Sequence, residues 1–190
     1  MKKKFVCLLI LVTAFSLMAV GCGQAKAQVE IKSPEEAVKM EGDPLKNLAI
    51  KEKQWLSSLD SARAEIAQSF TDWEQGNITR EDFTNQLKKS NGRVKVLMKE
   101  YDLHMDANPF PEDRKKEAVY KDGLAYGKKL RTTVNNFIFR STEGILDFET
   151  KEFKLLTDDQ IKGLYESDMV GKYDEYRAKL EPALKEADEK

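Results

Sequence analysis

Apolar residues recur every three or four positions through most of the chain, a spacing that places them on one face of an α-helix. Two long stretches with this period predict amphipathic helices over 44–75 and 80–107. The apolar face of the first consists of Leu45, Leu48, Trp55, Leu59, Ala62, Ile66 and Trp73. The corresponding face of the second consists of Phe83, Leu87, Ser90, Val94, Leu97, Tyr101 and His104.

The same period resumes after Pro111 and again after Thr157. It predicts a third helix from about 112 to 148, a connector over 149–156, and a fourth helix from 158 towards the C-terminus. Segment 132–136 contains β-branched and asparagine residues with low helix propensity, so we expect a kink in the third helix there. In the fourth helix we expect a bend at Gly171 and strain at Pro182.

Residues that favour helix N-termini precede each long stretch. These capping pairs are Asp43 with Pro44, Thr79 with Asp82, and Thr157 with Gln160. A further start signal at Ser33 and Pro34 predicts a short helix that ends at Gly42. Long amphipathic helices joined by short turns favour an all-α fold, and we expect an antiparallel four-helix bundle with a short N-terminal helix.

The first 22 residues have a different pattern. Lys2, Lys3 and Lys4 precede the mainly apolar segment 5–20, which is followed by Gly21 and Cys22. A basic start, an apolar middle and small residues at the exit are the parts of a secretory signal peptide. The apolar segment is shorter than the ~20 residues that cross a bilayer. An uncleaved membrane helix and a plain secreted protein are the alternatives.

The junction Ala19-Val20-Gly21-Cys22 resembles the lipobox of bacterial lipoproteins. The resemblance implies cleavage before Cys22 and attachment of a diacylglycerol to its thiol. It divides the chain into a signal peptide (1–21), a lipidated cysteine with a flexible tether (22–32) and a helical domain (33–190). It also implies a protein anchored in the cell membrane or the outer membrane and exposed outside the cytoplasm, with the membrane as a partner.

Charge and cysteine content narrow the functional classes. The signal segment holds three of the 32 basic residues and none of the 33 acidic ones, so the mature chain has a net charge of −4. Mild acidity argues against nucleic-acid binding, which needs a basic surface. Both cysteines, Cys7 and Cys22, lie in the first 22 residues, so we expect no disulfide in the helical domain and no cofactor.

His104 is the single histidine of the chain. Di-iron sites in helical bundles need two Glu-x-x-His motifs, whereas the nearest glutamate here, Glu100, is four residues away. The position one turn from a helix C-terminus favours the imidazolium ion, and we therefore expect a structural or capping role. A metal-binding role is the weaker alternative.

Two further groups of residues are candidates for binding. Tyr165, Tyr173 and Tyr176 either line a groove or, as we expect from their spacing, belong to the core. A set of small residues on three helices predicts either close helix packing, which we favour, or a pocket beneath it. This set is Ala62, Ser90, Gly92, Gly123 and Gly127.

No pair of carboxylates or nucleophile beside a base stands out from the evenly spaced charges, so an enzyme is not expected. The leading hypothesis is a membrane-anchored, non-catalytic binding or scaffolding module with an envelope protein as its partner. The alternative is a sensory domain that binds a small ligand or a metal ion.

Overall fold

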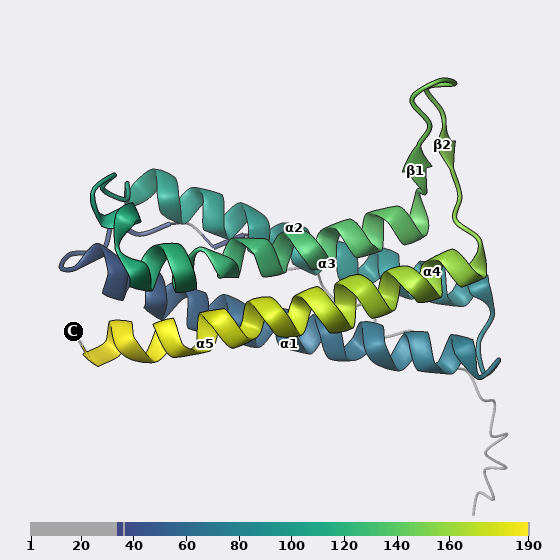
Figure 1. Cartoon of the computed structure of the whole chain (residues 1–190), viewed down its shortest axis with the longest axis horizontal. Helices are drawn as coiled ribbons and strands as arrows, with labels where there is room; N and C mark the ends of the chain where they lie inside the picture. The colour runs from purple at the N-terminus through teal and green to yellow at the C-terminus, as the bar shows by residue number, and fades with distance from the viewer. Residues whose placement is uncertain (1–33, 36, 190) are drawn as a thin grey trace, which may run out of the picture.

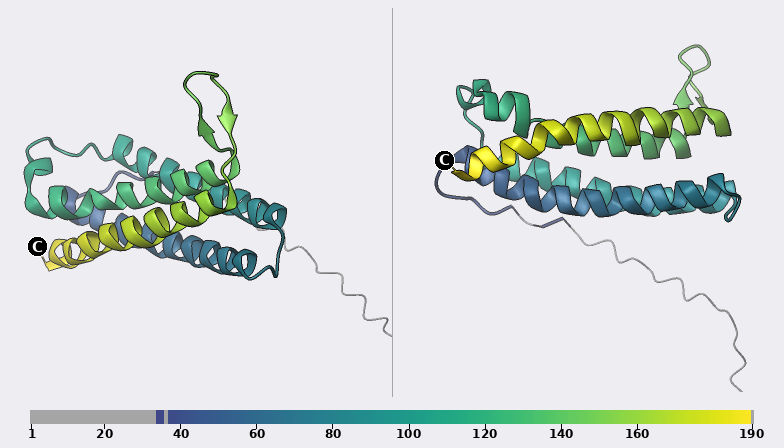
Figure 2. Two further views of the ribbon diagram at one scale, coloured as in Figure 1. Left: turned by 45° about the vertical axis from the view of Figure 1, so that its right-hand side comes forward. Right: turned by 60° about the horizontal axis from the view of Figure 1, so that its bottom comes forward.

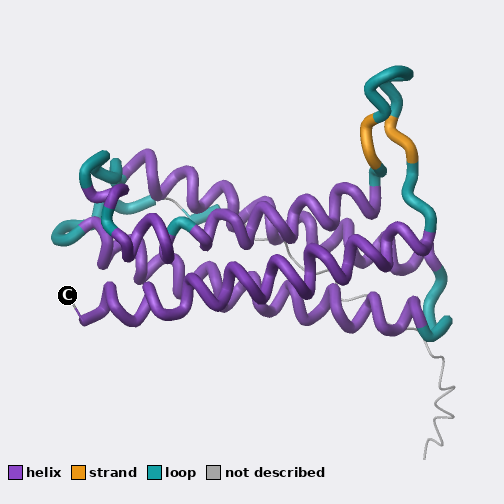
Figure 3. Tube along the Cα trace, viewed as in Figure 1, coloured by secondary structure: helices purple, strands orange, loops and turns teal. Residues whose placement is uncertain are grey.

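The computed structural model describes residues 34, 35 and 37–189, and this part of the chain is mostly helical. The long helices lie side by side as a bundle, and a small hairpin projects from one end (Figures 1 and 3). The helical elements are α1 (Pro44–Glu74), α2 (Arg80–Ala107), η1 (Arg114–Lys116), η2 (Tyr120–Leu124), α3 (Tyr126–Thr142), α4 (Asp158–Leu164), η3 (Tyr165–Lys172) and α5 (Tyr173–Glu189). The strands are β1 (Ile145–Leu146) and β2 (Phe153–Lys154), which pair antiparallel.

The first two predicted helices are confirmed. Asp43 caps α1, because its Oδ1 accepts hydrogen bonds from the amides of Leu45 (2.8 Å) and Lys46 (3.1 Å). The glycine that follows this helix, Gly76, has a φ of +74°, a conformation that ends a helix at little cost for glycine. Thr79 and Asp82 form the predicted capping box, and α2 runs from Arg80 to Ala107.

The third predicted helix is wrong at both ends. After α2 the chain forms a short 3₁₀ turn and a π-helical turn, η2, before the α-helix proper starts at Tyr126. Segment 132–136 lies inside continuous α-helix, so the irregularity falls at η2 and not at the predicted kink. The helix ends at Thr142 because Gly144 has a φ of +94°, and the predicted connector forms the β1–β2 hairpin.

The fourth predicted helix begins where expected, with a capping box of Thr157 and Gln160. Three segments then follow end to end: α4, the π-helical η3, which contains Gly171, and α5, which contains Pro182. The short N-terminal helix is not formed by the described residues, since 34, 35 and 37–42 are non-helical. The signal peptide, Cys22 and the whole tether lie outside the described residues. Within the described residues, no helix is long and apolar enough to cross a bilayer.

The core lies along the axis of the bundle, where the predicted stripes meet. Trp73 stacks on Phe83 between α1 and α2, with ring centroids 4.9 Å apart. Phe70 stacks on Tyr165 of η3 at 3.8 Å. Each large apolar side chain buried in this way contributes about 1.5–3 kcal/mol, so packing stabilises the bundle more than helix propensity does.

Candidate functional site

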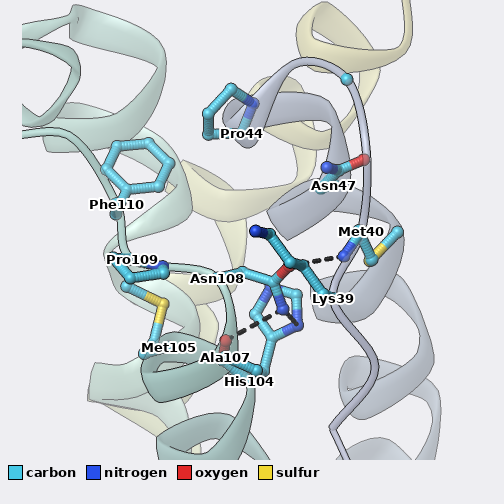
Figure 4. A pocket seen from close by; sticks show the side chains of 11 residues that line it. Lys39, Met40, Pro44, Asn47, His104, Met105, Ala107, Asn108, Pro109 and Phe110 are labelled. Atoms are coloured by element: carbon cyan, nitrogen blue, oxygen red, sulfur yellow. Dashed lines mark hydrogen bonds between the residues drawn. The ribbon is translucent and has the colours of Figure 1, made fainter.

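An extended segment of the N-terminal region crosses the bundle beside His104. We call this segment the strap; it consists of residues 37–43 with Glu35 ahead of them. Asn108, the residue that caps α2, makes two hydrogen bonds to the strap. Its Oδ1 accepts from the amide of Met40 at 2.7 Å (Figure 4), and its Nδ2 donates to the carbonyl of Val38 at 3.1 Å. The amide of Glu35 donates to Glu100 Oε1 at 3.2 Å. Side chains of α2 and its cap therefore hydrogen-bond the main-chain groups of the strap, which lacks a neighbouring strand to pair with.

His104 lies buried beneath this strap. Its Nδ1 is 3.3 Å from Asn108 Nδ2, and its ring meets Trp55 edge to face, with centroids 5.6 Å apart. Burial, and then the ammonium of Lys51, lower the pKa of His104. The structure thus favours the neutral imidazole, whereas its position on the helix alone favoured the cation. The C-terminus of α2 is capped by the main chain and side chain of Asn108, both of which donate to the carbonyl of His104.

Two clefts meet at His104. The larger has a volume of about 150 Å³, is open to solvent, and is lined by Lys39, Asn47, Met105, Asn108 and Phe110 among others (Figure 4). The smaller has a volume of only about 10 Å³, room for about one water molecule, and is lined by Glu35, Lys51, Trp55 and Glu100. In the part of the chain that the structure describes, no group of three or more histidine, cysteine or acidic side chains is placed to hold a metal ion.

A buried ion pair lies one helical turn from this site. Both guanidinium NH groups of Arg131 donate to the carboxylate of Glu52, at 2.6 and 2.9 Å, and both side chains are almost completely buried. The guanidinium also lies 5.0 Å from the ring centroid of Trp55 and 4.7 Å from that of Tyr101, within range of cation–π attraction. Burial, with the neighbouring Tyr120 and Glu52, raises the pKa of Tyr101, so its phenol remains neutral.

Gly127 makes room for this pair. A Cβ atom at Gly127 would lie 2.1 Å from Glu52 Oε2, well inside van der Waals contact. The ion pair joins residues that are 79 positions apart, and their spacing in the sequence carries no signal that they meet. The pair is bidentate and buried, and it joins α1 to α3, so removing either partner alone would leave an unpaired buried charge.

The predicted small residues do not meet at one height of the bundle. Gly127 faces Glu52, which lies ten residues before Ala62 on α1, or about 15 Å along the helix. Gly123 packs against Ala183 of α5, where a Cβ would come within 2.1 Å of the alanine Cβ. Ala62 and Ser90 are buried, and Gly92 is half-buried. Close packing is therefore present at Gly123 and Gly127, but with separate partners.

The three tyrosines of the last helical stretch pack into or against the core. Tyr173 is buried, its hydroxyl donates to Asp60 Oδ1 at 2.6 Å, and burial followed by this contact raises its pKa. Tyr165 stacks on Phe70, and the half-buried Tyr176 packs beside Tyr126 with centroids 5.4 Å apart. These rings contribute to helix packing, as their spacing suggested.

The hairpin at the other end of the bundle was not predicted from the sequence, which indicated a connector over 149–156. Phe148, Leu155 and Phe153 are 76%, 70% and 52% exposed, and Ile145 and Phe139 also reach the surface. Leu146 and Phe153 are cross-strand partners on one face, and Phe153 packs edge to face on Phe139 of α3. The hairpin projects away from the helices in every view (Figures 1 and 2). Exposed apolar side chains of this size concentrate here.

Comparisons of the chain with models of protein families, with curated proteins and with solved structures find no match.

Proposed function

We propose that this protein is a membrane-anchored, extracytoplasmic binding or scaffolding module without catalytic activity, lipidated at Cys22. The observation that carries the proposal is the projecting hairpin, whose large apolar side chains remain exposed although Phe153 packs on Phe139. An aromatic side chain has about 150–250 Å² to bury, so five large apolar residues exposed to these degrees leave on the order of 500 Å² of apolar surface in water. Patches of this size on monomers are often functional.

Two other exposed apolar residues, Val38 and Ile50, lie on the strap and on α1, away from the hairpin. Isolated apolar residues of that kind are normal on protein surfaces. The contrast supports the hairpin as the binding surface.

The proposed architecture is an antiparallel four-helix bundle. The short connection between α1 and α2, together with the contacts of α2 with α3 and of α5 with both α1 and α3, supports this topology. A bundle of this kind provides a stiff support on which a small binding element can project from one end.

The experiment is site-specific photocrosslinking in the native membrane. A photoreactive phenylalanine analogue replaces Phe148 in the full chain, and the matched control carries it at the exposed Lys121 near the opposite end. We expect a discrete adduct from position 148 and none from position 121. Absence of an adduct at 148 overturns the binding role, and mass spectrometry that finds an unmodified Cys22 overturns the anchor.

A second candidate function is the binding of a small ligand or metal ion at His104. It is favoured by the position of this imidazole at the junction of two clefts that also expose Lys39, Asn47 and Glu100. Titration of the purified protein with Zn²⁺, followed through the fluorescence of Trp55 next to His104, tests it. A saturable change that is lost in His104→Gln supports this function, and an unchanged emission spectrum removes it.

A further inference from the structure

A third cleft lies at the root of the hairpin, between the end of α3 and the start of the last helical stretch. It has a volume of about 270 Å³, is open to solvent, and is lined by Arg140, Ile145, Leu156, Gln160, Gly163 and Leu164 among others. Gly163 leaves this space free, because a Cβ atom there would have no neighbour within 4 Å. We call it the root cleft.

The root cleft has a mixed lining, in which apolar side chains lie beside Gln160 and Ser167, and Arg140 adds a positive group. Arg140 is 41% exposed in its side chain and lies 3.7 Å from Asp168, which Lys172 already contacts at 2.7 Å. This long ion pair leaves the guanidinium with donors for a further acceptor.

The tip of the same hairpin has the complementary character. Phe148 is the most exposed large apolar residue of those described, and the exposed carboxylates Glu149 and Glu152 lie beside it in the sequence. Asp147 is paired with Lys154 across the hairpin. Lys151 also lies at the tip, with its ammonium 5.9 Å from the ring centroid of Phe148. The tip therefore combines an aromatic ring with two exposed carboxylates and one ammonium group.

Tip and root cleft lie at opposite ends of one short hairpin, so a tip cannot reach the root cleft of its own chain. We propose that the partner of this surface is a second copy of the chain, and that the tip of each copy inserts into the root cleft of the other about a two-fold axis. In this arrangement Phe148 packs against Gly163 and Leu164 of the other copy, and Glu149 pairs with its Arg140. The inference rests on the proposed function of the hairpin as a binding surface.

The available area fits a weak dimer. About 500 Å² of apolar surface on each copy gives roughly the 1,000 Å² at which specific interfaces begin. A contact of this strength depends on local concentration, and lipid anchors that confine both copies to one membrane raise that concentration. Because the contact is isologous, it closes as a dimer and does not extend into fibres.

The test uses the mature lipidated chain reconstituted in phosphatidylcholine vesicles. Lys121→Cys provides one labelling site for a donor or an acceptor dye, and energy transfer between copies reports association. We expect transfer well above the level for random proximity at the same surface density. Phe148→Asp and Gly163→Leu should each lower the association constant at least tenfold, the first by removing the ring and the second by filling the root cleft. Ile50→Ser, which removes an exposed apolar residue elsewhere, should leave it unchanged.

A mixture of the two variants that should not associate alone tests whether the tip of one copy binds the root cleft of the other. Donor-labelled Phe148→Asp retains an intact root cleft, and acceptor-labelled Gly163→Leu retains an intact tip, so the mixed pair should recover one of the two contacts. Circular dichroism should show that both variants are folded, since neither changed side chain is in the core. Recovery of transfer in the mixture but in neither variant alone supports the exchange.

Other outcomes overturn the inference in distinguishable ways. Random-level transfer in the wild type, with a crosslink from position 148 to a different protein, rejects self-association and leaves the proposed function standing. Random-level transfer with no crosslink rejects both. Loss of transfer in Phe148→Asp but not in Gly163→Leu shows that the tip binds outside the root cleft, which also rejects the proposal.

Discussion

The two ends of the bundle treat their polar and apolar groups in opposite ways. At the strapped end, polar side chains such as Glu52, Arg131 and Asn108 have hydrogen-bond partners within the protein, and His104 is buried among them. At the hairpin end, Phe148, Phe153 and Leu155 remain in water. Buried polar groups need partners to avoid a large desolvation cost, whereas exposed apolar groups gain from a partner that has not yet bound.

This difference separates residues that fix the fold from residues that make contacts. Substitutions at the strapped end should lower the free energy of unfolding, and substitutions of the exposed apolar side chains at the hairpin end should change association with little effect on that free energy.

The largest effect is expected for Arg131→Leu. It leaves the carboxylate of Glu52 buried without its partner, and such a change costs about 3–5 kcal/mol of unfolding free energy. Urea denaturation monitored by circular dichroism measures it. The control is the double variant Glu52→Leu with Arg131→Leu, which removes both charges and should recover most of the loss. Equal losses in the single and double variants would contradict a specific role for the pair.

Gly127→Ala should come next. The added methyl group collides with Glu52 and displaces it from Arg131, so we expect a loss of about 1–3 kcal/mol, as for other overpacked sites. Gly163→Ala is the matched control at the hairpin end, where the added methyl group meets no atom within 4 Å. There the gain in helix propensity should stabilise the protein by about 0.5–1 kcal/mol. Thermal melts that show the same sign for both would break the comparison between the two ends.

Asn108→Ala should cost about 1 kcal/mol, because it removes the hydrogen bonds that hold the strap. Hydrogen exchange should show faster exchange at the amide of Met40, and unchanged exchange in α4. Asn77→Ala, at the exposed turn between α1 and α2, is the control and should not affect the strap. A strap that remains protected in Asn108→Ala would show that other contacts hold it.

A smaller effect is expected from pH. The pKa of His104 is lowered in the folded state, so the unfolded chain binds a proton more readily and stability falls as pH decreases below about 6.5. The change of stability with pH should be shallow, because the carboxylates of Glu35 and Glu100 line the same small cleft and partly offset the positive charge of Lys51. Urea midpoints at pH 7.5 and 5.5 measure the slope, and the wild type should lose more stability than His104→Gln between these values. Identical slopes would show that His104 titrates in the same way in both states.

The smallest effect on stability is expected for Phe148→Ser. The side chain is three-quarters exposed, so its removal should change the free energy of unfolding by less than about 0.5 kcal/mol. Thermal melts of the monomeric protein test this. A loss above 1 kcal/mol would place Phe148 among the residues that support the fold.

The helices were predictable from sequence where local signals agree. The period of apolar residues, Asp43 as a cap and the Thr79–Asp82 box together located α1 and α2. The hairpin was missed because each strand has two residues, too few for a strand period, and because helical spacing continues through Ile145 and Phe148. The positive φ of Gly144 ends the helix before the hairpin. A single glycine in a helical pattern is only a weak sign that the helix ends there.

The sites were less predictable. His104 was identified as the distinctive polar side chain of its helix, but its neutral state depends on Lys51 and on the strap, which only tertiary structure brings to it. The alignment of α1 with α3 decides that Gly127 meets Glu52 and not Ala62. Stripes of apolar residues specify which face of a helix is buried but not its height along its neighbours.

The strap has a mechanical consequence. With Cys22 lipidated as proposed, any pull between the membrane and the bundle acts on the strap from Glu35 towards Asp43. Its hydrogen bonds to Glu100 and Asn108 then carry the load one after another, so the strap peels at low force instead of resisting as a unit. Release of residues 37–43 adds about 25 Å to the tether at 3.3–3.6 Å per residue. It also moves the point of attachment from the side of the bundle to the start of α1, so that a bundle held along its flank becomes one held by its end.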